Sequence, residues 1–393
     1  MAGDPKFVGQ SRVWGWPGPS GTAFALVGAW TETALSIDFS FLRKPRSLVG
    51  LDIGSSAVKA IELKPQGKNG YRVSAFAVEP IPPDTIVDGA IIDAVAVADA
   101  IRRIFETKRF KSVEVVASLS GNAVIVKKIA LPVMTPAELA ESIQWEAEQY
   151  IPFDVQDVNI DYQVLDGGGA ESGKQTMDVL LVAAKKDKIA DYTGVIAQAG
   201  RTPVIVDVDA FAVQNCFETN YGSDAGVTVL LNAGASAINV NIVSGDQSLF
   251  TRDISVGGNA YTEAIQKEFG LAFDAAEEAK KGKAIDGVSN EDLQHVLHTM
   301  SEAVLLEVQK TFDFFKATTD AGRIDRVLVC GGASQVEGFT ELIAERFDTP
   351  VERLNPFKTI GFDAASSKVA ASVDAASTAS VAVGLALRRM GDR

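Results

Sequence analysis

An apolar run at residues 47–53 ends at a glycine, Gly54. A short apolar run that ends at glycine is typical of a buried strand followed by a tight turn. Residues 57–63 form a second run that is again rich in apolar positions. The pattern therefore predicts a strand, a Gly-Ser-Ser turn and a second strand that folds back on the first.

The polar residues of this hairpin are of the types that bind phosphate. Gly54 lets the backbone approach a ligand closely, and Ser55 and Ser56 offer hydroxyl and amide donors. Lys59 on the following strand supplies a point charge suited to phosphate, and Asp52 is placed to hold a water molecule on a metal ion. An ordinary hairpin with a glycine turn is the competing interpretation, because such short motifs are weak on their own.

A second copy of the pattern favours the functional interpretation. Residues 228–243 align without gaps on residues 48–63 at an offset of 180 residues. Identical pairs include Leu51/Leu231, Gly54/Gly234, Ser56/Ser236 and Ala57/Ala237. Two such hairpins half a chain apart predict two related lobes that hold one polyphosphate from both sides.

The rest of the chain alternates between helical and strand patterns. The clearest helix start is Thr135, which is followed by Pro136 and by Glu138 at the capping-box position. Residues 1–40 show neither the helical nor the strand period of apolar residues, and we expect them to be a disordered or loosely attached extension. We expect a first lobe at 41–225 with a small α+β subdomain inserted at about 121–203, a second lobe at 226–374, and a C-terminal helix at 375–393 that packs back between the lobes.

Composition narrows the classes of function. The formal net charge is −14, without Lys/Arg-rich runs, which argues against sequence-independent binding to nucleic acid or to a bare anionic membrane. Cys216 and Cys330 are the only cysteines and both lie in apolar surroundings, so neither a disulfide framework nor a cysteine zinc site is expected. His295 and His298 have ligand-like spacing, but no carboxylate or cysteine cluster accompanies them, so we interpret them as solvated helix residues.

No apolar run approaches the roughly 18–20 residues that span a bilayer. The sequence therefore predicts no transmembrane segment, and any membrane association would depend on a partner or a surface. An amphipathic membrane helix is the alternative interpretation of the C-terminal helix, but its polar face carries Ser and Ala rather than Lys and Arg, which favours packing between the lobes.

Five features of the chain stand in the order found in the actin-like ATPase superfamily, which the chain resembles. They are the first hairpin at residues 52–59, a connecting helix after Asp209, the second hairpin at 232–236, the stretch 276–280, and the glycine-rich turn 331–334. The superfamily also includes heat-shock chaperones, sugar kinases and the division protein FtsA. The resemblance implies an α/β, actin-like (ribonuclease H-like) fold with two lobes, a duplicated core and a small α+β subdomain inserted in the first lobe.

Within that superfamily the chain resembles the PilM family of type IV pilus assembly proteins. The stretches that carry this resemblance are residues 47–59, 124–129, 146–153, 251–258 and 355–357. The most specific of them reads Glu-Ala-Glu-Gln-Tyr-Ile-Pro-Phe, at residues 146–153. The resemblance extends from about residue 41 to the C-terminus and leaves the N-terminal extension unexplained.

The resemblance implies that ATP and Mg²⁺ bind in the cleft between the lobes. Gly54, Ser55, Ser56 and Lys59 would then hold the β- and γ-phosphates, with Asn232, Gly234, Ala235 and Ser236 closing from the other side. Glu277 and Lys280 would reach the ribose and base, Gly331, Gly332 and Ala333 would lie against the nucleotide, and Asp52 would order the water shell of the metal.

One position departs from the superfamily pattern. The second hairpin usually begins with an aspartate, whereas this chain has Asn232, which keeps the size of the side chain but removes its charge. Asp209 is the candidate for positioning the attacking water. We therefore expect hydrolysis to be slow or absent, with ATP acting mainly as a structural ligand.

The PilM-family resemblance further implies a cytoplasmic adaptor, peripheral at the inner membrane, that links the membrane platform of the pilus to its motor. The cytoplasmic N-terminal segment of PilN would lie between the core of the first lobe and the inserted subdomain. Two alternatives stay open: an FtsA-like polymerising protein that associates with membranes during cell division, and an enzyme of the sugar-kinase class, against which Asn232 weighs.

Overall fold

The computed structural model describes residues 14–15, 47–67, 70–107, 110–165, 175–222, 226–319, 323–363 and 376–390. The predicted N-terminal extension therefore lies almost entirely outside the described residues. Within it, the two-residue strand β1 (Trp14–Gly15) pairs antiparallel with β11 (Thr202–Val208).

Two sheets repeat one topology. In the first, the antiparallel meander β2 (Val49–Ile53), β3 (Ala57–Gln66) and β4 (Gly70–Pro80) is extended by parallel β7 (Glu114–Leu119) next to β2. In the second, β12 (Val227–Ala233), β13 (Ile238–Ser244) and β14 (Gln247–Ile254) form the meander. Parallel β15 (Arg326–Cys330) lies next to β12. The sequence repeat is therefore a structural duplication.

The edges of the two sheets differ. The first sheet has the order β1-β11-β7-β2-β3-β4-β17, with β17 (Gly361–Phe362) parallel to β4. The second has the order β14-β13-β12-β15-β16, with β16 (Val351–Arg353) parallel to β15. Because the central strands β2 and β12 are covered on both faces, their sequences are almost wholly apolar and buried.

A separate sheet of three strands occupies the predicted insertion. It has the order β8-β10-β9, built from β8 (Val124–Pro132), β10 (Thr176–Lys185) and β9 (Val158–Val164). Helix α2 (Pro136–Glu148) packs on it through Leu139, Ile143 and Ala147, and begins with the expected capping box. The Thr135 backbone N–H donates to Glu138 Oε2 at 2.7 Å.

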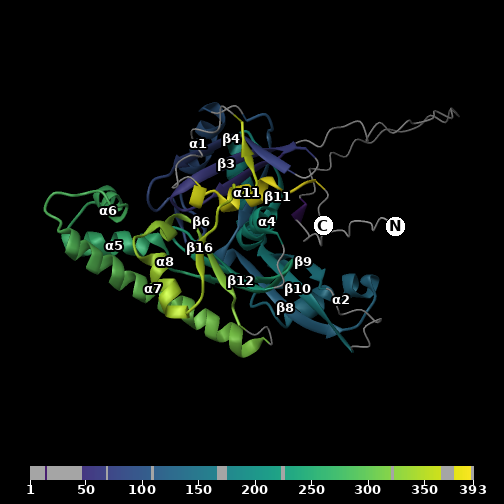
Figure 1. Ribbon diagram of the computed structural model, residues 1–393. Helices are drawn as coiled ribbons and strands as arrows, with labels where there is room; N and C mark the ends of the chain where they lie inside the picture. The colour runs from purple at the N-terminus through teal and green to yellow at the C-terminus, as the bar shows by residue number, and fades with distance from the viewer. Residues whose placement is uncertain are drawn as a thin grey trace.

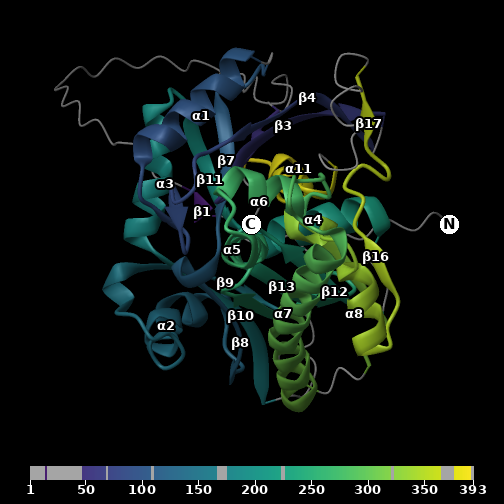
Figure 2. The same cartoon turned by 90° about the vertical axis from the view of Figure 1, so that its left-hand side faces the viewer.

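The three-stranded sheet is shorter in sequence than the insertion that we expected at about 121–203. Helix α3 (Lys186–Gln198) packs with α1 (Ala94–Thr107) in the core of the first sheet, as Figure 2 shows along one flank of the molecule. Strand β11 likewise belongs to the first sheet. We define the three-stranded unit as β8 to β10 with α2, while the domain boundaries themselves stay predictions.

Two helices lie in the layer between the large sheets. Residues of α4 (Asp209–Tyr221) and α11 (Ser380–Ala386) share one core with residues from both sheets, and Figure 1 shows both helices near the centre of the molecule. On the far side of the second sheet lie α5 (Gly258–Phe269), α6 (Phe273–Lys280), α7 (Asn290–Thr318) and α8 (Phe339–Phe347).

The packing of α11 is close enough to require glycine. A Cβ at Gly384 would lie 1.7 Å from the carbonyl oxygen of Ala212 in α4, and a Cβ at Gly50 in β2 would lie 2.1 Å from the carbonyl oxygen of Ala382. Every residue of α11 is buried. Beyond the helix, the buried side chains of Arg388 and Asp207 form an ion pair at 2.6 Å. This helix is therefore part of the core and has no face left for a membrane.

Among the described ranges, no helix combines the length and the hydropathy that crossing a bilayer requires.

We predict that Gly384→Ala destabilises the protein by about 1–3 kcal/mol or more, because the added methyl group overlaps the backbone of α4. Urea unfolding measures this loss. The matched control is Gly194→Ala in α3, where a Cβ would meet no heavy atom within 4 Å. The control should be neutral or gain up to about 1 kcal/mol. Equal stability of the wild type and Gly384→Ala would contradict the packing described here.

Candidate functional site

The two hairpins have the same turn and touch one another. The Gly54 backbone N–H donates to the carbonyl of Ala57 at 3.2 Å, and the Gly234 N–H donates to the carbonyl of Ala237 at 2.9 Å. Ser55 Oγ and Ser236 Oγ lie 2.8 Å apart and share a hydrogen bond. Residues that are 181 positions apart in sequence thus bring the tips of the two hairpins together.

The equivalent polar positions on the two hairpins carry different chemistry. Asp52 and Lys59 face each other across β2 and β3, and Lys59 Nζ donates to Asp52 Oδ2 at 2.9 Å. A Cβ at Gly54 would lie 3.3 Å from Lys59 Nζ, so the ammonium group sits beside the glycine turn. On the second hairpin, Asn232 and Asn239 face each other, and Asn232 Nδ2 donates to Asn239 Oδ1 at 2.9 Å. An ion pair on one side is matched by a neutral amide pair on the other.

The glycine-rich turn after β15 lies against the second hairpin. Gly331 has φ 87°, and a Cβ there would lie 2.2 Å from the carbonyl oxygen of Ala233. Ala333 is buried, whereas Gly332 is exposed and a Cβ on it would approach only Thr378 Cγ2, at 3.8 Å. The exposed Gly332 backbone is therefore the part of this turn that a ligand can approach.

The start of α5 also belongs to this group of segments. The Gly258 N–H donates to the carbonyl of Gly234 at 2.9 Å, and the Asn259 N–H donates to that of Ala235 at 2.8 Å. A Cβ at Gly257 would lie 2.6 Å from the Ala235 carbonyl oxygen. In the sequence, Gly257 and Gly258 are a Gly-Gly pair, and such a pair before a helix is a signal of close approach to another backbone.

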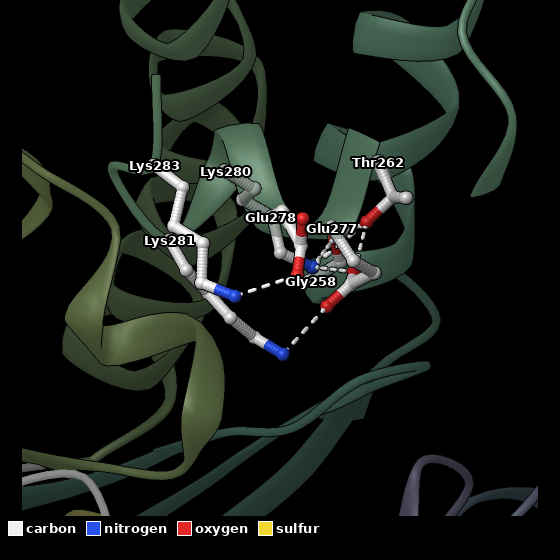
Figure 3. Close-up of polar contacts among 7 residues, drawn as sticks. All are labelled: Gly258, Thr262, Glu277, Glu278, Lys280, Lys281 and Lys283. Carbon is white, nitrogen blue, oxygen red and sulfur yellow. Dashed lines mark hydrogen bonds and ion pairs between the residues drawn. The ribbon is translucent and has the colours of Figure 1, made fainter. Parts of the chain in front are cut away.

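Glu277 and Lys280 of α6 bind each other and the first turn of α5 (Figure 3). Lys280 Nζ pairs with Glu277 Oε1 and donates to the Gly258 carbonyl at 3.0 Å and to Thr262 Oγ1 at 2.7 Å. Burial opposes the ionisation of Glu277, but the adjacent Lys280 ammonium and Thr262 hydroxyl outweigh it and lower the pKa of Glu277. Burial lowers the pKa of Lys280, against the effect of Glu277. Gly258 thus connects this pair to the second hairpin, because its carbonyl accepts from Lys280 and its N–H donates to Gly234.

Asp209 begins α4 and faces the turn that follows β7. Ser118 Oγ donates to Asp209 Oδ1 at 2.5 Å, and Ser120 donates to the same carboxylate. Loss of hydration and the nearby negative charge of Asp52 raise the pKa of Asp209 to about 7. Burial, followed by the negative charges of Asp209 and Asp52, raises the pKa of Tyr192. Ser118, Ser120 and Tyr192 belong to this region but carried no recognisable motif in the sequence.

A metal ion would need ligands beyond those the protein assembles by itself. In the described ranges, no group of three or more His, Cys, Asp or Glu side chains is placed to hold a metal. Asp52, the predicted water-mediated ligand, accepts from Lys59. The cationic Lys59, the hydroxyls of Ser55 and Ser236 and the exposed Gly332 backbone are suited to the oxygens of a polyphosphate, which would supply the missing metal ligands.

The duplicated sheets, the paired hairpins and the central helices define an actin-like protein with two lobes. A family profile described as "Type IV pilus assembly protein PilM" matches residues 50–390. The chain therefore belongs to the PilM family of type IV pilus assembly proteins.

Two solved structures resemble the chain. One is described as "PilM-PilN type IV pilus biogenesis complex"; it has a TM-score of 0.76 and 27% sequence identity, and the match covers 88% of this chain and 99% of that one. The other is the ethanolamine utilization protein EutJ from Carboxydothermus hydrogenoformans, with a TM-score of 0.52 and 14% identity over 88% of this chain and 90% of that one. The EutJ match shows the fold alone.

We predict that Asp209→Asn changes how stability depends on pH. The pKa of Asp209 is raised from 3.8 to about 7 by folding, so the folded state binds the extra proton between these values. Stability that protonation of Asp209 provides is present below about pH 4 and is lost as the pH rises through about 7. The free energy of unfolding of Asp209→Asn, relative to wild type, should therefore increase over this window and then level off.

Urea unfolding across this pH range makes the measurement, and the exposed Asp313→Asn on α7 is the control. A difference between Asp209→Asn and wild type that stays constant with pH would show that Asp209 is not a carboxyl group with a raised pKa.

Proposed function

We propose that this PilM-family protein binds ATP with Mg²⁺ where its two hairpins meet, and that it serves as an adaptor that binds the cytoplasmic N-terminal segment of PilN. The observation that carries the nucleotide proposal is the contact between Ser55 and Ser236, which joins two copies of one phosphate-binding pattern. The adaptor proposal rests on family membership and on the likeness to the PilM-PilN complex.

Each predicted site residue has a role in this proposal. Lys59, Gly54, Ser55 and Ser56 bind phosphate oxygens from the first lobe, while Asn232, Gly234, Ala235 and Ser236 do so from the second. Gly331, Gly332 and Ala333 accommodate the nucleotide against backbone, and Glu277 and Lys280 bind the ribose and base. Asp52 orders water on the metal ion, for which it has to share its carboxylate with Lys59. ATP supplies a bound polyphosphate that joins the lobes.

Hydrolysis is slow or absent in this proposal. Asn232 lacks a carboxylate, and its amide is already bound to Asn239. Asp209, the candidate that would position water, accepts from two serine hydroxyls and has a pKa of about 7. ATP then acts as a ligand that stabilises one arrangement of the lobes.

The proposed PilN segment lies where the three-stranded unit meets the first lobe. One face of this sheet is covered by α2. On the other face, Leu180 and Val182 pack with Val208 at the end of β11 and Phe211 at the start of α4. Val124 and Val126 complete this apolar junction and are only partly buried. An extended apolar segment can dock beside such a junction. We propose that binding of the PilN segment keeps this protein in the cytoplasm, peripheral at the inner membrane, where it connects the membrane platform to the motor.

We predict that Lys59→Met weakens ATP binding by about 10- to 100-fold, since a charge-assisted hydrogen bond contributes about 1.5–3 kcal/mol. Calorimetric titration with Mg-ATP measures it. The double variant Asp52→Asn/Lys59→Met leaves no unpaired carboxylate, so it separates loss of the ammonium group from misfolding and should bind as weakly. Lys310→Ala, an exposed residue of α7, is the control that keeps full affinity. Unchanged affinity in both hairpin variants would reassign this hairpin to a structural role.

We also predict that a synthetic peptide of the cytoplasmic N-terminal segment of the PilN from the same organism binds the purified chain. Titration calorimetry with the peptide, in the presence and in the absence of Mg-ATP, measures this binding, and a scrambled peptide is the control. If the native peptide binds no better than the scrambled one under either condition, the adaptor role is wrong.

A further inference from the structure

A chain of hydrogen bonds leads from the second hairpin to the base of the three-stranded unit. Asn232 Nδ2 donates to Asn239 Oδ1 at 2.9 Å, and Asn239 Nδ2 donates to Asp253 Oδ1 at 2.7 Å. The other oxygen of Asp253, Oδ2, accepts from the backbone N–H of Gly121. Gly121 begins the short turn Gly121–Ala123 that leads directly into β8.

This chain crosses between parts of the fold that are far apart in sequence. Asp253 lies on β14, the edge strand of the second sheet, and 132 positions separate it from Gly121. Strand β14 contacts both β8 and the turn before it. In the first lobe, Asp209 accepts from Ser118 at the end of β7 and from Ser120, the residue that precedes this turn. The entry to the three-stranded unit is thus fixed by one carboxylate from each lobe.

The Asp253 carboxylate, which can only accept, determines the direction of every hydrogen bond in this chain. Both oxygens of the Asp253 carboxylate accept, so the Asn239 amide must present its NH₂ group to Asp253 and its oxygen to Asn232. Asn239 is buried, so water cannot replace a partner that is lost. Asn232 must therefore donate, which an aspartate at this position cannot do. The asparagine at position 232, where the superfamily usually has an aspartate, is therefore explained by Asp253, which lies outside the hairpin.

We propose that Asp253 is a positioning residue that, through Asn239, holds Asn232 as a donor and couples the nucleotide hairpin to the three-stranded unit. The proposal rests on the function proposed above, since it concerns how the nucleotide regulates partner binding. A ligand that moves the second hairpin moves Asn232, and the movement reaches the turn at Gly121 through two side chains. Nucleotide binding then alters the affinity for the PilN segment, and the peptide alters the affinity for nucleotide by the same factor.

Reversing the direction of the chain tests this proposal. Asn232→Asp alone places two acceptors face to face, and rotation of the Asn239 amide only moves that conflict to Asp253. Asp253→Asn alone makes the Asn239 and Asn232 amides both rotate, and the Asn232 NH₂ group then faces the Cys330 thiol, which donates to Asn232 Oδ1 in the wild type. The double variant Asn232→Asp/Asp253→Asn satisfies every group again, because the new amide accepts from Gly121 and donates to Asn239, which donates to the new carboxylate. Asp286→Asn, an exposed change of the same kind, is the control.

Two measurements are made on these variants and the wild type. The first is the melting temperature, which each single variant should lower and the double variant should restore. The second is the ratio of the peptide dissociation constants without and with Mg-ATP, which should differ from one by at least about fivefold in the wild type. The ratio should approach one in each single variant and return in the double variant.

Three results would overturn the inference: Asp253→Asn with an unchanged ratio, a double variant no better than the single ones, or a wild-type ratio near one with the peptide bound. Peptide that binds none of these proteins would instead refute the proposed function, and the coupling with it. The melting temperatures of the single and double variants then still test whether the hydrogen bonds of this chain all run in the one direction described.

Discussion

The fold depends on how closely the backbones of α4 and α11 approach each other between the two large sheets. Gly384 touches the carbonyl of Ala212, and Gly50 lets β2 meet Ala382, so a helix from the end of the chain packs directly on the first lobe. Residues of both sheets join this core. Because the layer is thin and has no room for larger side chains, the two lobes are held at a separation at which their hairpin tips touch.

The hairpins show how one duplicated scaffold carries two kinds of chemistry. The backbone turn is kept in both copies, while the facing side chains are an acid with a base in one and two amides in the other. Lys59 can exchange Asp52 for a phosphate oxygen, because its ammonium group has a strong acceptor both without and with the phosphate. The amide pair is instead tied to Asp253, outside the hairpin. The first lobe is thereby suited to binding charge and the second to transmitting a change of position.

Local features were well predicted from the sequence, because they depend on residues close together in the chain. The capping box at Thr135 and both hairpins follow from such signals, and the repeat at an offset of 180 residues predicted the duplicated fold. The family resemblance is confirmed by the profile match and by the PilM-PilN structure. The nucleotide roles of the site residues stay predictions.

Other features could not be read from the sequence because they join distant segments. The Gly257-Gly258 pair signals a close backbone approach but not that its partner is the second hairpin, and no motif marks the contact of Asp253 with Gly121. The sequence assigned Asp52 to the metal's water shell, yet the fold gives it Lys59 as a partner. The extent of the three-stranded unit also depended on where α3 packs, since helix periodicity does not tell which sheet a helix covers.

A crystal structure of the chain with Mg²⁺ and a non-hydrolysable ATP analogue tests the central claim most directly. The account predicts phosphate oxygens within hydrogen-bond distance of Lys59 Nζ on one lobe and of Ser236 on the other, with the metal bound through phosphate oxygens and water near Asp52. An analogue bound elsewhere, or density absent from the site at saturating concentration while Ser55 and Ser236 stay hydrogen-bonded to each other, would contradict it.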